Sequence, residues 1–221
     1  MDSVVVGMCV HNDYDIARDA IKSVWNNTPY GMFVIDDGGY DKDFHKFCDE
    51  NYVDYQSGDR LYPLSNGGAW LDRLLNYYIK HYPQYGYLMK IDTDTRVWDE
   101  LYIPDGVKVM GQKVIDPRTD WVFLAGGCRV ISRDTADTIV QSGVLSDECY
   151  KHRPFDYTRH RLSDGEILAS EDRIFAHVCD RLGIPKTPTT QFHLNWTGHE
   201  LPFDTGMQYV ASHPHYGNYY Q

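Results

Sequence analysis

Apolar and polar positions follow two different periods along the first hundred residues. Residues 4–10 ("VVVGMCV") form a short, β-branched and almost wholly apolar run, which is typical of a buried strand. Residues 15–27 instead place Ile16, Ala20, Ile21 and Val24 on one face of a helix. The segment Asn26-Asn27-Thr28-Pro29 ends that helix, so a strand is followed directly by a helix.

The same exchange of periods continues up to residue 91. The pattern predicts a strand over 31–39, a helix over 41–51, a helix over 66–82 and a strand over 87–91. Near-continuous apolar strands that alternate with amphipathic helices indicate a parallel sheet with helices on its faces. The chain is therefore predicted to be an α/β protein.

The second half of the chain is less regular. The pattern predicts strands over 107–115 and 120–134, a helix over 134–143, a loop over 146–166 and a helix over 170–184. We expect Gly126-Gly127 to interrupt the second of these strands, and Ser170 to be the N-cap of the last helix. The tail beyond Pro185 is rich in aromatic residues, histidine and proline, and it shows little periodicity.

Composition and charge narrow the class of protein. The 221 residues are 42% hydrophobic and 24% charged, which fits one globular domain with a full core. The net charge of −11 argues against a surface that binds nucleic acid or anionic membranes over its whole extent. The basic segment "KHRPFDYTRHR" (151–161) leaves a local site for nucleic acid open, although solvated ion pairs explain it equally well.

Cysteine spacing and hydropathy bear on the compartment. The five cysteines lack a C-x-x-C spacing, and we expect them to be reduced. No apolar run reaches the roughly 18 residues that a membrane span requires. The start "MDSVVVGMCV" is acidic at its second residue and enters a strand, unlike a signal peptide. We therefore expect a cytoplasmic protein without a membrane span.

Polar side chains follow three of the predicted strands. His11-Asn12-Asp13, Asp36-Asp37 and Asp92-Thr93-Asp94 each stand where an apolar run ends. In parallel sheets the carboxyl ends of the strands meet at one edge, and ligands bind there. We therefore expect these three groups to lie close together and to form a site.

The spacing of Asp92 and Asp94 suggests a cation. Two carboxylates this close repel, and each raises the pKa of the other unless a positive charge lies between them. One or two carboxylates, completed by water and phosphate oxygens, are a common Mg²⁺ or Mn²⁺ site. Taken alone, the pair is explained equally well by a solvated acidic turn.

Two further segments allow both a binding role and a plain turn. The carboxylates of Asp36 and Asp37 can accept from a nucleobase N–H, or they can cap the turn at Gly38-Gly39. Asn66-Gly67-Gly68 precedes a helix, and backbone N–H groups at such a position can face a diphosphate. Taken singly, these residues leave both readings open.

Six segments together carry a family resemblance. They are "VVVGMCVHND", "FVIDDGG", "NGG…LDRLLNYYI", "YLMKIDTDT", "LAGGCRVISR" and "SEDRIFAHVCDRLGI". In this order they resemble the GT-A-fold glycosyltransferases, most of all the family-2 type, over roughly residues 3–184. The resemblance implies a GT-A fold, with a nucleotide-binding half over 1–98 and an acceptor-side half with the tail over 99–221. It also implies a nucleotide-sugar donor, with a UDP-sugar favoured, and a bound Mn²⁺ or Mg²⁺.

The resemblance also assigns roles to single residues. Asp92 and Asp94 match the metal-binding D-x-D motif. Such enzymes often complete the metal site with a histidine near the C-terminus; of His193, His199, His213 and His215, the last two stand closest to the expected place, and His213 is chosen over His215. The nucleoside contacts are Asn12 with Asp36 or Asp37, and Arg73 resembles a basic residue near the diphosphate. Gly126 and Gly127 match a glycine loop that lines the donor sugar and the acceptor. Glu171 and Asp172 match the x-E-D motif, in which the aspartate is the usual base, so the resemblance implies inversion at the anomeric carbon.

Two alternatives belong to other classes. A nucleotidyltransferase usually has a glycine-rich, basic phosphate loop after its first strand, whereas this chain has the acidic "HNDYD". A non-catalytic module that binds a sugar or a nucleotide has no need for the acids of both motifs.

The acceptor stays open. A glycan, a protein, a lipid carrier and a modified base in DNA all offer a hydroxyl group. Nucleic acid is the less favoured partner because the chain is acidic. By analogy with small bacterial and viral enzymes, the host cytoplasm is the alternative location.

Overall fold

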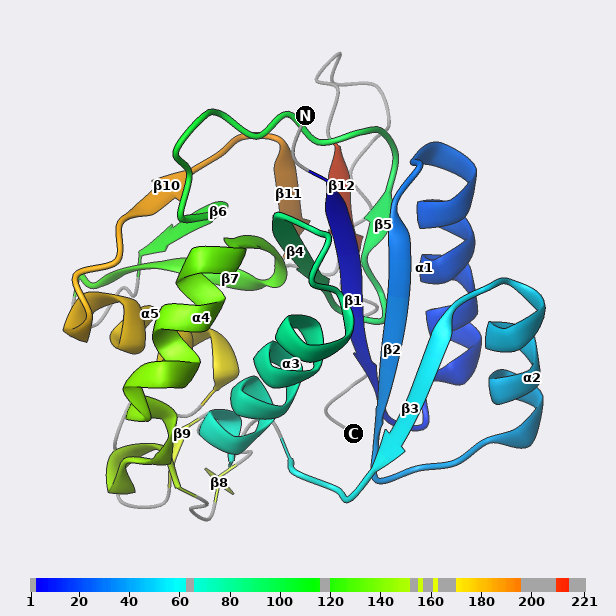
Figure 1. Cartoon of the computed structure of the whole chain (residues 1–221), viewed down its shortest axis with the longest axis horizontal. Helices are drawn as coiled ribbons and strands as arrows, with labels where there is room; N and C mark the ends of the chain where they lie inside the picture. Colours follow the sequence, from blue (N-terminus) through cyan, green and yellow to red (C-terminus); the bar gives the residue numbers. More distant parts are fainter. Residues whose placement is uncertain are drawn as a thin grey trace.

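The computed structural model describes residues 3–62, 66–115, 120–151, 155–156, 161–162, 170–195 and 210–214. These residues form one large sheet with helices on both faces, together with a small sheet beside it (Figure 1). The helices are α1 (Tyr14–Asn27), α2 (Lys42–Glu50), α3 (Gly67–His81), α4 (Arg133–Ser142) and α5 (Glu171–Arg181), with short 3₁₀ helices η1 (Val144–Ser146) and η2 (Glu148–Tyr150).

The large sheet has seven strands in the order β10-β6-β7-β4-β1-β2-β3. They are β1 (Val4–Val10), β2 (Gly31–Asp37), β3 (Asp54–Gly58), β4 (Tyr87–Ile91), β6 (Val109–Ile115), β7 (Val122–Ser132) and β10 (Lys186–Pro188). Strand β7 runs antiparallel to β4 and β6, and the other neighbouring pairs are parallel. The prediction of an α/β fold with a mostly parallel central sheet is confirmed.

Both faces of the sheet are apolar, which is why the strands read as continuous apolar runs. In β1, Val4, Val6, Met8 and Val10 belong to the core beneath α1 and α2. Val5 points to the opposite face and belongs to the core beneath α3, α4 and α5. Because a β-strand alternates its side chains between the two faces, each buried strand needs apolar residues at every position.

The order of the strands reverses between β1 and β4. The chain leaves β1 through α1 to reach β2, and it arrives at β4 through α3, which covers the opposite face (Figure 1). Ligands of open α/β sheets bind at the carboxyl ends of the strands where the strand order reverses. Residues 11–13 and 92–94 follow those two ends, so the fold brings together two of the three polar groups expected at this edge.

The strand predictions are incomplete in one place and confirmed in part in another. Strand β3 was not predicted, because it is a polar edge strand whose residues are mostly exposed. The break expected at Gly126-Gly127 is confirmed in part: β7 keeps its strand conformation through both glycines, but its pairing with β6 shifts register there, from Gly111 opposite Arg129 to Lys113 opposite Leu124.

The tail returns to the acidic strand end. Strands β11 (Phe192–Asn195) and β12 (Ala211–Pro214) form a three-stranded sheet with β5 (Arg96–Val97). The loop predicted over 146–166 contains η2 and a hairpin of β8 (Phe155–Asp156) with β9 (Arg161–Leu162), and its remaining parts lie largely outside the described residues.

The described parts of the chain agree with two further predictions. No helix in them is both long and apolar enough to span a bilayer. All five cysteines are unpaired, and Cys48, Cys128 and Cys179 are buried.

Candidate functional site

The acidic strand end after β4 is a tight turn anchored to β7. Asp92 N donates to Gly127 O at 3.0 Å, and the Thr95 hydroxyl donates to the same oxygen at 2.7 Å. Thr95 N closes the turn by donating to Asp92 O at 3.1 Å. The Asp92 side chain is 41% exposed, whereas Asp94 is only 5% exposed, so the two carboxylates lie at different depths.

The end of β1 lies near this turn. Burial raises the pKa of Asp13, and the Asp94 carboxylate raises it further, against the opposing effects of His11 and Arg60. Asn12 has a φ of 62°, in the left-handed region that asparagine tolerates better than most residues. Its amide nitrogen lies 3.0 Å from His11 Nε2. The carboxyl ends of β1 and β4 therefore place Asp13 close enough to Asp94 for the two charges to interact.

A buried lysine joins the acidic turn to helix α5. Lys90 is 2% exposed and donates to Asp92 Oδ1 at 2.5 Å, Gly126 O at 2.6 Å and Glu171 Oε1 at 2.7 Å. Burial by itself would lower the pKa of Lys90, but the carboxylates of Asp92 and Glu171 together raise it above its ordinary value. The ammonium group therefore stays charged, and it has three acceptors.

A second buried cation holds the other oxygen of Glu171. Arg129 faces Lys90 across the β4–β7 pair, and its Nη2 donates to Glu171 Oε2. The guanidinium carbon lies 4.7 Å from the centre of the Phe175 ring. Arg129 is 1% exposed, and its Nε and Nη1 have no hydrogen-bond partner among the residues that the structure describes. Glu171 is thus enclosed between two cations.

Asp172 occupies the first turn of α5 beside Glu171. Its Oδ1 accepts from the Ser170 hydroxyl, and from Arg173 N at 2.8 Å. The expected capping role of Ser170 is wrong in one respect, because its side chain bonds to Asp172 and not to the helix backbone. Asp172 is 8% exposed and lies at the positive end of the helix dipole.

Gly126 allows α5 to approach β7 this closely. A Cβ atom at this position would lie 2.8 Å from Glu171 Oε1 and 3.0 Å from Asp172 Cβ. The glycine therefore brings the two acids of the x-E-D motif against the strand whose next residue, Gly127, anchors Asp92. In this way Asp92, Asp94, Gly126, Gly127, Glu171 and Asp172 are brought together in one region.

The glycines that open α3 pack against other helices. A Cβ at Gly67 would lie 2.9 Å from Ile174 Cδ1, and one at Gly68 would lie 2.8 Å from Tyr150 Cβ. Both glycines are buried. Asn66 is at the N-cap position but makes no side-chain capping bond. Close packing of helices accounts for the two glycines, and the structure describes no exposed cradle of N–H groups at them.

The two aspartates after β2 differ in their surroundings. Asp36 has no exposed surface, and it accepts from Tyr55 OH at 2.6 Å, Gly39 N at 3.0 Å and Tyr14 OH at 3.1 Å. These internal bonds use both carboxylate oxygens, which gives Asp36 a role in holding the fold. It is the less suitable of the two candidates for a nucleobase contact.

Asp37 instead gathers cations from two segments. It accepts from Leu61 N at 2.8 Å, from Arg60 Nη1 at 3.2 Å and from Arg73 Nη1 at 3.4 Å. Arg73 comes from α3 and is about a quarter exposed. The fold thus brings two of the predicted residues, Asp37 and Arg73, into direct contact.

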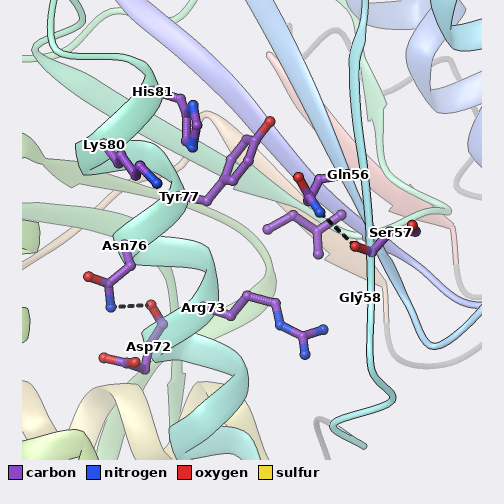
Figure 2. Close-up of a pocket in the computed structure, with 10 residues that line it drawn as sticks. Gln56, Ser57, Gly58, Asp72, Arg73, Asn76, Tyr77, Lys80 and His81 are labelled. Atoms are coloured by element: carbon purple, nitrogen blue, oxygen red, sulfur yellow. Dashed lines mark hydrogen bonds between the residues drawn. The ribbon is translucent and has the colours of Figure 1, made fainter.

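A pocket of about 320 Å³ lies between the edge strand β3 and α3 (Figure 2). Arg73 reaches toward Gly58 at one end, whereas Tyr77, Lys80 and His81 lie further along the helix. The remaining lining residues are Ile35, Gln56, Ser57, Asp72 and Asn76. The sequence did not predict this pocket, because one of its walls is the strand that the apolar pattern missed.

The backbone of His213 lies beside the acidic turn. Strand β12 pairs antiparallel with β5 through Ser212 and Arg96, so His213 comes next on the side of Thr95. The side chain of His213 lies outside the described residues. The same holds for most of the basic segment 151–161, including residues 152–154 and 157–160.

Lys90 and Arg129 are the residues of this region that the sequence analysis missed. Each stands inside an apolar strand, where a charge is costly unless it is paired. A charged residue inside an apolar strand could have indicated this cluster in the sequence, because buried cations require buried anions nearby.

Within the described residues, no group of three or more His, Cys, Asp or Glu side chains is arranged to hold a metal ion by itself. Comparison of the sequence with protein-family models and with curated proteins finds no match. The case for a function therefore depends on the residues and on their geometry.

Proposed function

We propose that this protein is a metal-dependent glycosyltransferase, which transfers a sugar from a nucleotide-sugar, with a UDP-sugar favoured, to an acceptor hydroxyl. The observation that carries the proposal is the contact of Lys90 with both Asp92 and Glu171. It brings the D-x-D turn and the first turn of α5 together at the strand-order reversal, where ligands of α/β sheets bind. In this proposal the acids of the turn hold the metal that stabilises the leaving diphosphate, and an acid of α5 takes the acceptor proton.

The nucleoside side of the donor is assigned to the region of Asn12, Asp37 and Arg73. Asp37 can accept from a base N–H, and Arg73 can bind a phosphate oxygen. The pocket beside Arg73 provides space between α3 and β3 next to these groups. Asn12 follows the end of β1, the strand between β2 and β4, and the proposal assigns it to the ribose.

A divalent cation is assigned to Asp92 and Asp94, with His213 as the candidate third ligand. The fit rests on the chemistry of the donors, because two carboxylates suit Mg²⁺ or Mn²⁺ when water and phosphate oxygens complete the shell. Such a site needs no closed cage of protein ligands, and the described residues do not provide one. When bound, the cation would stabilise negative charge on the departing diphosphate.

Asp172 is the proposed base. The acceptor oxygen attacks the anomeric carbon as the bond from that carbon to the diphosphate oxygen breaks, and the hydroxyl proton passes to Asp172. Attack on the side opposite the leaving group inverts the anomeric configuration. Glu171 is unsuited to this task, because Lys90 and Arg129 hold both of its oxygens. Its proposed role is therefore to fix α5 in place.

Calorimetric titration with UDP, GDP and dTDP, each with and without Mn²⁺, is the first test. We expect one nucleotide to bind tightly, and only when the metal is present. Failure of all three nucleotides to bind with Mn²⁺ present would refute the proposal. Metal-dependent binding without transfer or donor hydrolysis would instead favour a non-catalytic nucleotide-binding module.

Three single variants separate the assigned roles. Asp94→Ala should abolish metal-dependent nucleotide binding, whereas Asp172→Ala should retain binding and lose turnover. Release of UDP from a panel of UDP-sugars measures turnover before the acceptor is identified. Asp105→Ala, at an exposed turn, is the control and should behave like the unchanged protein. If Asp172→Ala keeps near-normal turnover, another group is the base.

A further inference from the structure

Lys90 is a buried counter-ion for the carboxylates of Asp92 and Glu171. Its ammonium group is fully enclosed and lies 5.4 Å from the centre of the Trp70 ring, with Asp92 Oδ1 as its closest acceptor at 2.5 Å. Asp92 differs from the other members of this group because its side chain is 41% exposed. A single carboxylate is thus shared between a buried cation on one side and solvent on the other.

If Asp92 binds another cation in place of Lys90, the charge balance around Lys90 changes. The ammonium group would keep Gly126 O and Glu171 Oε1 as acceptors. Glu171 also has Arg129, so the buried group would hold two cations and one anion. A surplus of buried positive charge is unfavourable, and like charges on the two sides of Asp92 repel.

We propose that the Lys90 ammonium group binds the Asp92 carboxylate in the metal-free protein and competes with a divalent cation for that carboxylate. Lys90 would thereby be a positioning residue that sets the affinity of the donor site for metal. This inference depends on the proposed function, since it takes Asp92 as a metal ligand. It also accounts for a buried lysine two residues before the acidic turn, where an apolar residue would complete the strand.

Competition and a purely structural role predict opposite changes in Mn²⁺ affinity when Lys90 is substituted. If Lys90 merely holds Asp92 in place for the metal, Lys90→Met should weaken Mn²⁺ binding. If the two cations compete, Lys90→Met should strengthen Mn²⁺ binding by about tenfold, which is within the usual range for two linked ligands. Methionine fills a similar volume, and Arg129 continues to balance Glu171.

The experiment measures the dissociation constant of Mn²⁺ by calorimetry in the full-length chain, with UDP present and absent. Arg129→Met is the matched control: this residue is also a buried cation bound to Glu171, but the carboxylate that it contacts is not Asp92. Its effect on Mn²⁺ affinity should be much smaller than that of Lys90→Met. Unchanged or weaker Mn²⁺ binding by a folded Lys90→Met protein would overturn the inference.

A measurement on the unchanged protein covers the case in which Lys90→Met does not fold. With ¹⁵N-labelled lysine, a buried ammonium group exchanges slowly, so its resonance can be followed. Saturation with Mg²⁺ and UDP should shift the Lys90 resonance as its Asp92 contact is lost, and an unmoved resonance would overturn the inference. Absence of any metal binding by the unchanged protein would instead show that the proposed function itself has failed.

Discussion

Lys90 and Glu171 are separated by 81 positions in the sequence, yet their Nζ and Oε1 atoms lie 2.7 Å apart in the interior. This ion pair joins the end of β4 to the first turn of α5. Because Lys90 also bonds to Asp92, it links the acids of the two motifs. The consequences for stability and for binding can be tested one residue at a time.

Removing Glu171 should destabilise the fold strongly. Glu171→Ala would leave Lys90 and Arg129 buried without their shared counter-ion, and breaking a buried pair costs about 3–5 kcal/mol. The control is Glu148→Ala, since Glu148 pairs with Lys151 but has a side chain that is 85% exposed. That variant should unfold at nearly the same urea concentration as the unchanged protein. Equal midpoints for the two variants would show that the buried network contributes nothing.

Gly126→Ala should separate α5 from β7. The added methyl group would lie 2.8 Å from Glu171 Oε1, so the helix or the strand must shift. We expect a loss of about 1–3 kcal/mol, the usual cost of overpacking, together with loss of turnover. Gly58→Ala provides a matched strand glycine, because its nearest neighbour is the flexible end of Arg73 at 3.1 Å. Thermal unfolding that ranks Gly58→Ala as the worse of the two would contradict this account.

The two ends of the pocket along α3 should differ in their effect on nucleotide binding. Arg73 contacts Asp37 and lies at the Gly58 end, whereas Lys80 lies about two turns further along the helix (Figure 2). Arg73→Met should therefore weaken nucleotide binding about tenfold or more, as expected for loss of a charge-assisted contact. Lys80→Met should leave the affinity nearly unchanged. Calorimetry compares the nucleotide affinities of the two variants. A larger loss of affinity in Lys80→Met would show that the nucleobase does not bind beside Asp37.

The tail histidines offer a test of the third metal ligand. His213 follows the residue that pairs with Arg96, whereas His193 pairs with Ser212 from the neighbouring strand. His213→Ala should weaken Mn²⁺ binding in the presence of nucleotide, and His193→Ala should not. Paramagnetic broadening of histidine resonances by Mn²⁺ provides an independent reading. Selective broadening of the His193 resonance would reassign the ligand.

Alkaline pH should weaken the fold through the tyrosines that bond to Asp36. Burial, together with the Asp36 carboxylate, raises the pKa of Tyr14 from 10.0 to about 12. A group whose pKa is higher in the folded state stabilises the fold fully below its unfolded pKa, and that contribution is lost as the pH rises through the folded value. Stability should therefore decline between about pH 10 and pH 12.

Tyr14→Phe tests that slope. The variant should be less stable than the unchanged protein at pH 8, by about 1 kcal/mol for one lost hydrogen bond, and its stability should fall less steeply between pH 10 and pH 12. Tyr52→Phe changes a tyrosine that is 85% exposed, and it should follow the unchanged protein at every pH. Urea unfolding at pH 8 and pH 11 distinguishes these cases. An equal slope in all three proteins would exclude the Tyr14–Asp36 bond as a source.

Several features of the site were predictable because they depend on local sequence. The apolar period predicted β1, β2 and β4, and the acids directly after them then had to lie at carboxyl ends of parallel strands. Asp92 and Asp94 became candidates in this way, whereas Asp172 became one only through its resemblance to the x-E-D motif. The glycines were only partly predictable: Gly126 lies where the pairing of β7 with β6 shifts register, as expected, but Gly67 and Gly68 are packed against neighbouring residues.

The sequence by itself determined helices α1 to α5, the apolar strands β1, β2, β4, β6 and β7, the class of the fold and the acids at the strand ends. Backbone geometry converts a period of two or of 3.6 residues directly into a strand or a helix. Only the tertiary structure decided which acids stay accessible to a ligand and which are satisfied by hydrogen bonds and ion pairs inside the fold. Asp36 accepts hydrogen bonds from Tyr14 and Tyr55. Glu171 is bound by Lys90 and Arg129. Asp92, in contrast, stays partly exposed. These outcomes depend on burial and on charges brought together from distant segments, which no local pattern encodes.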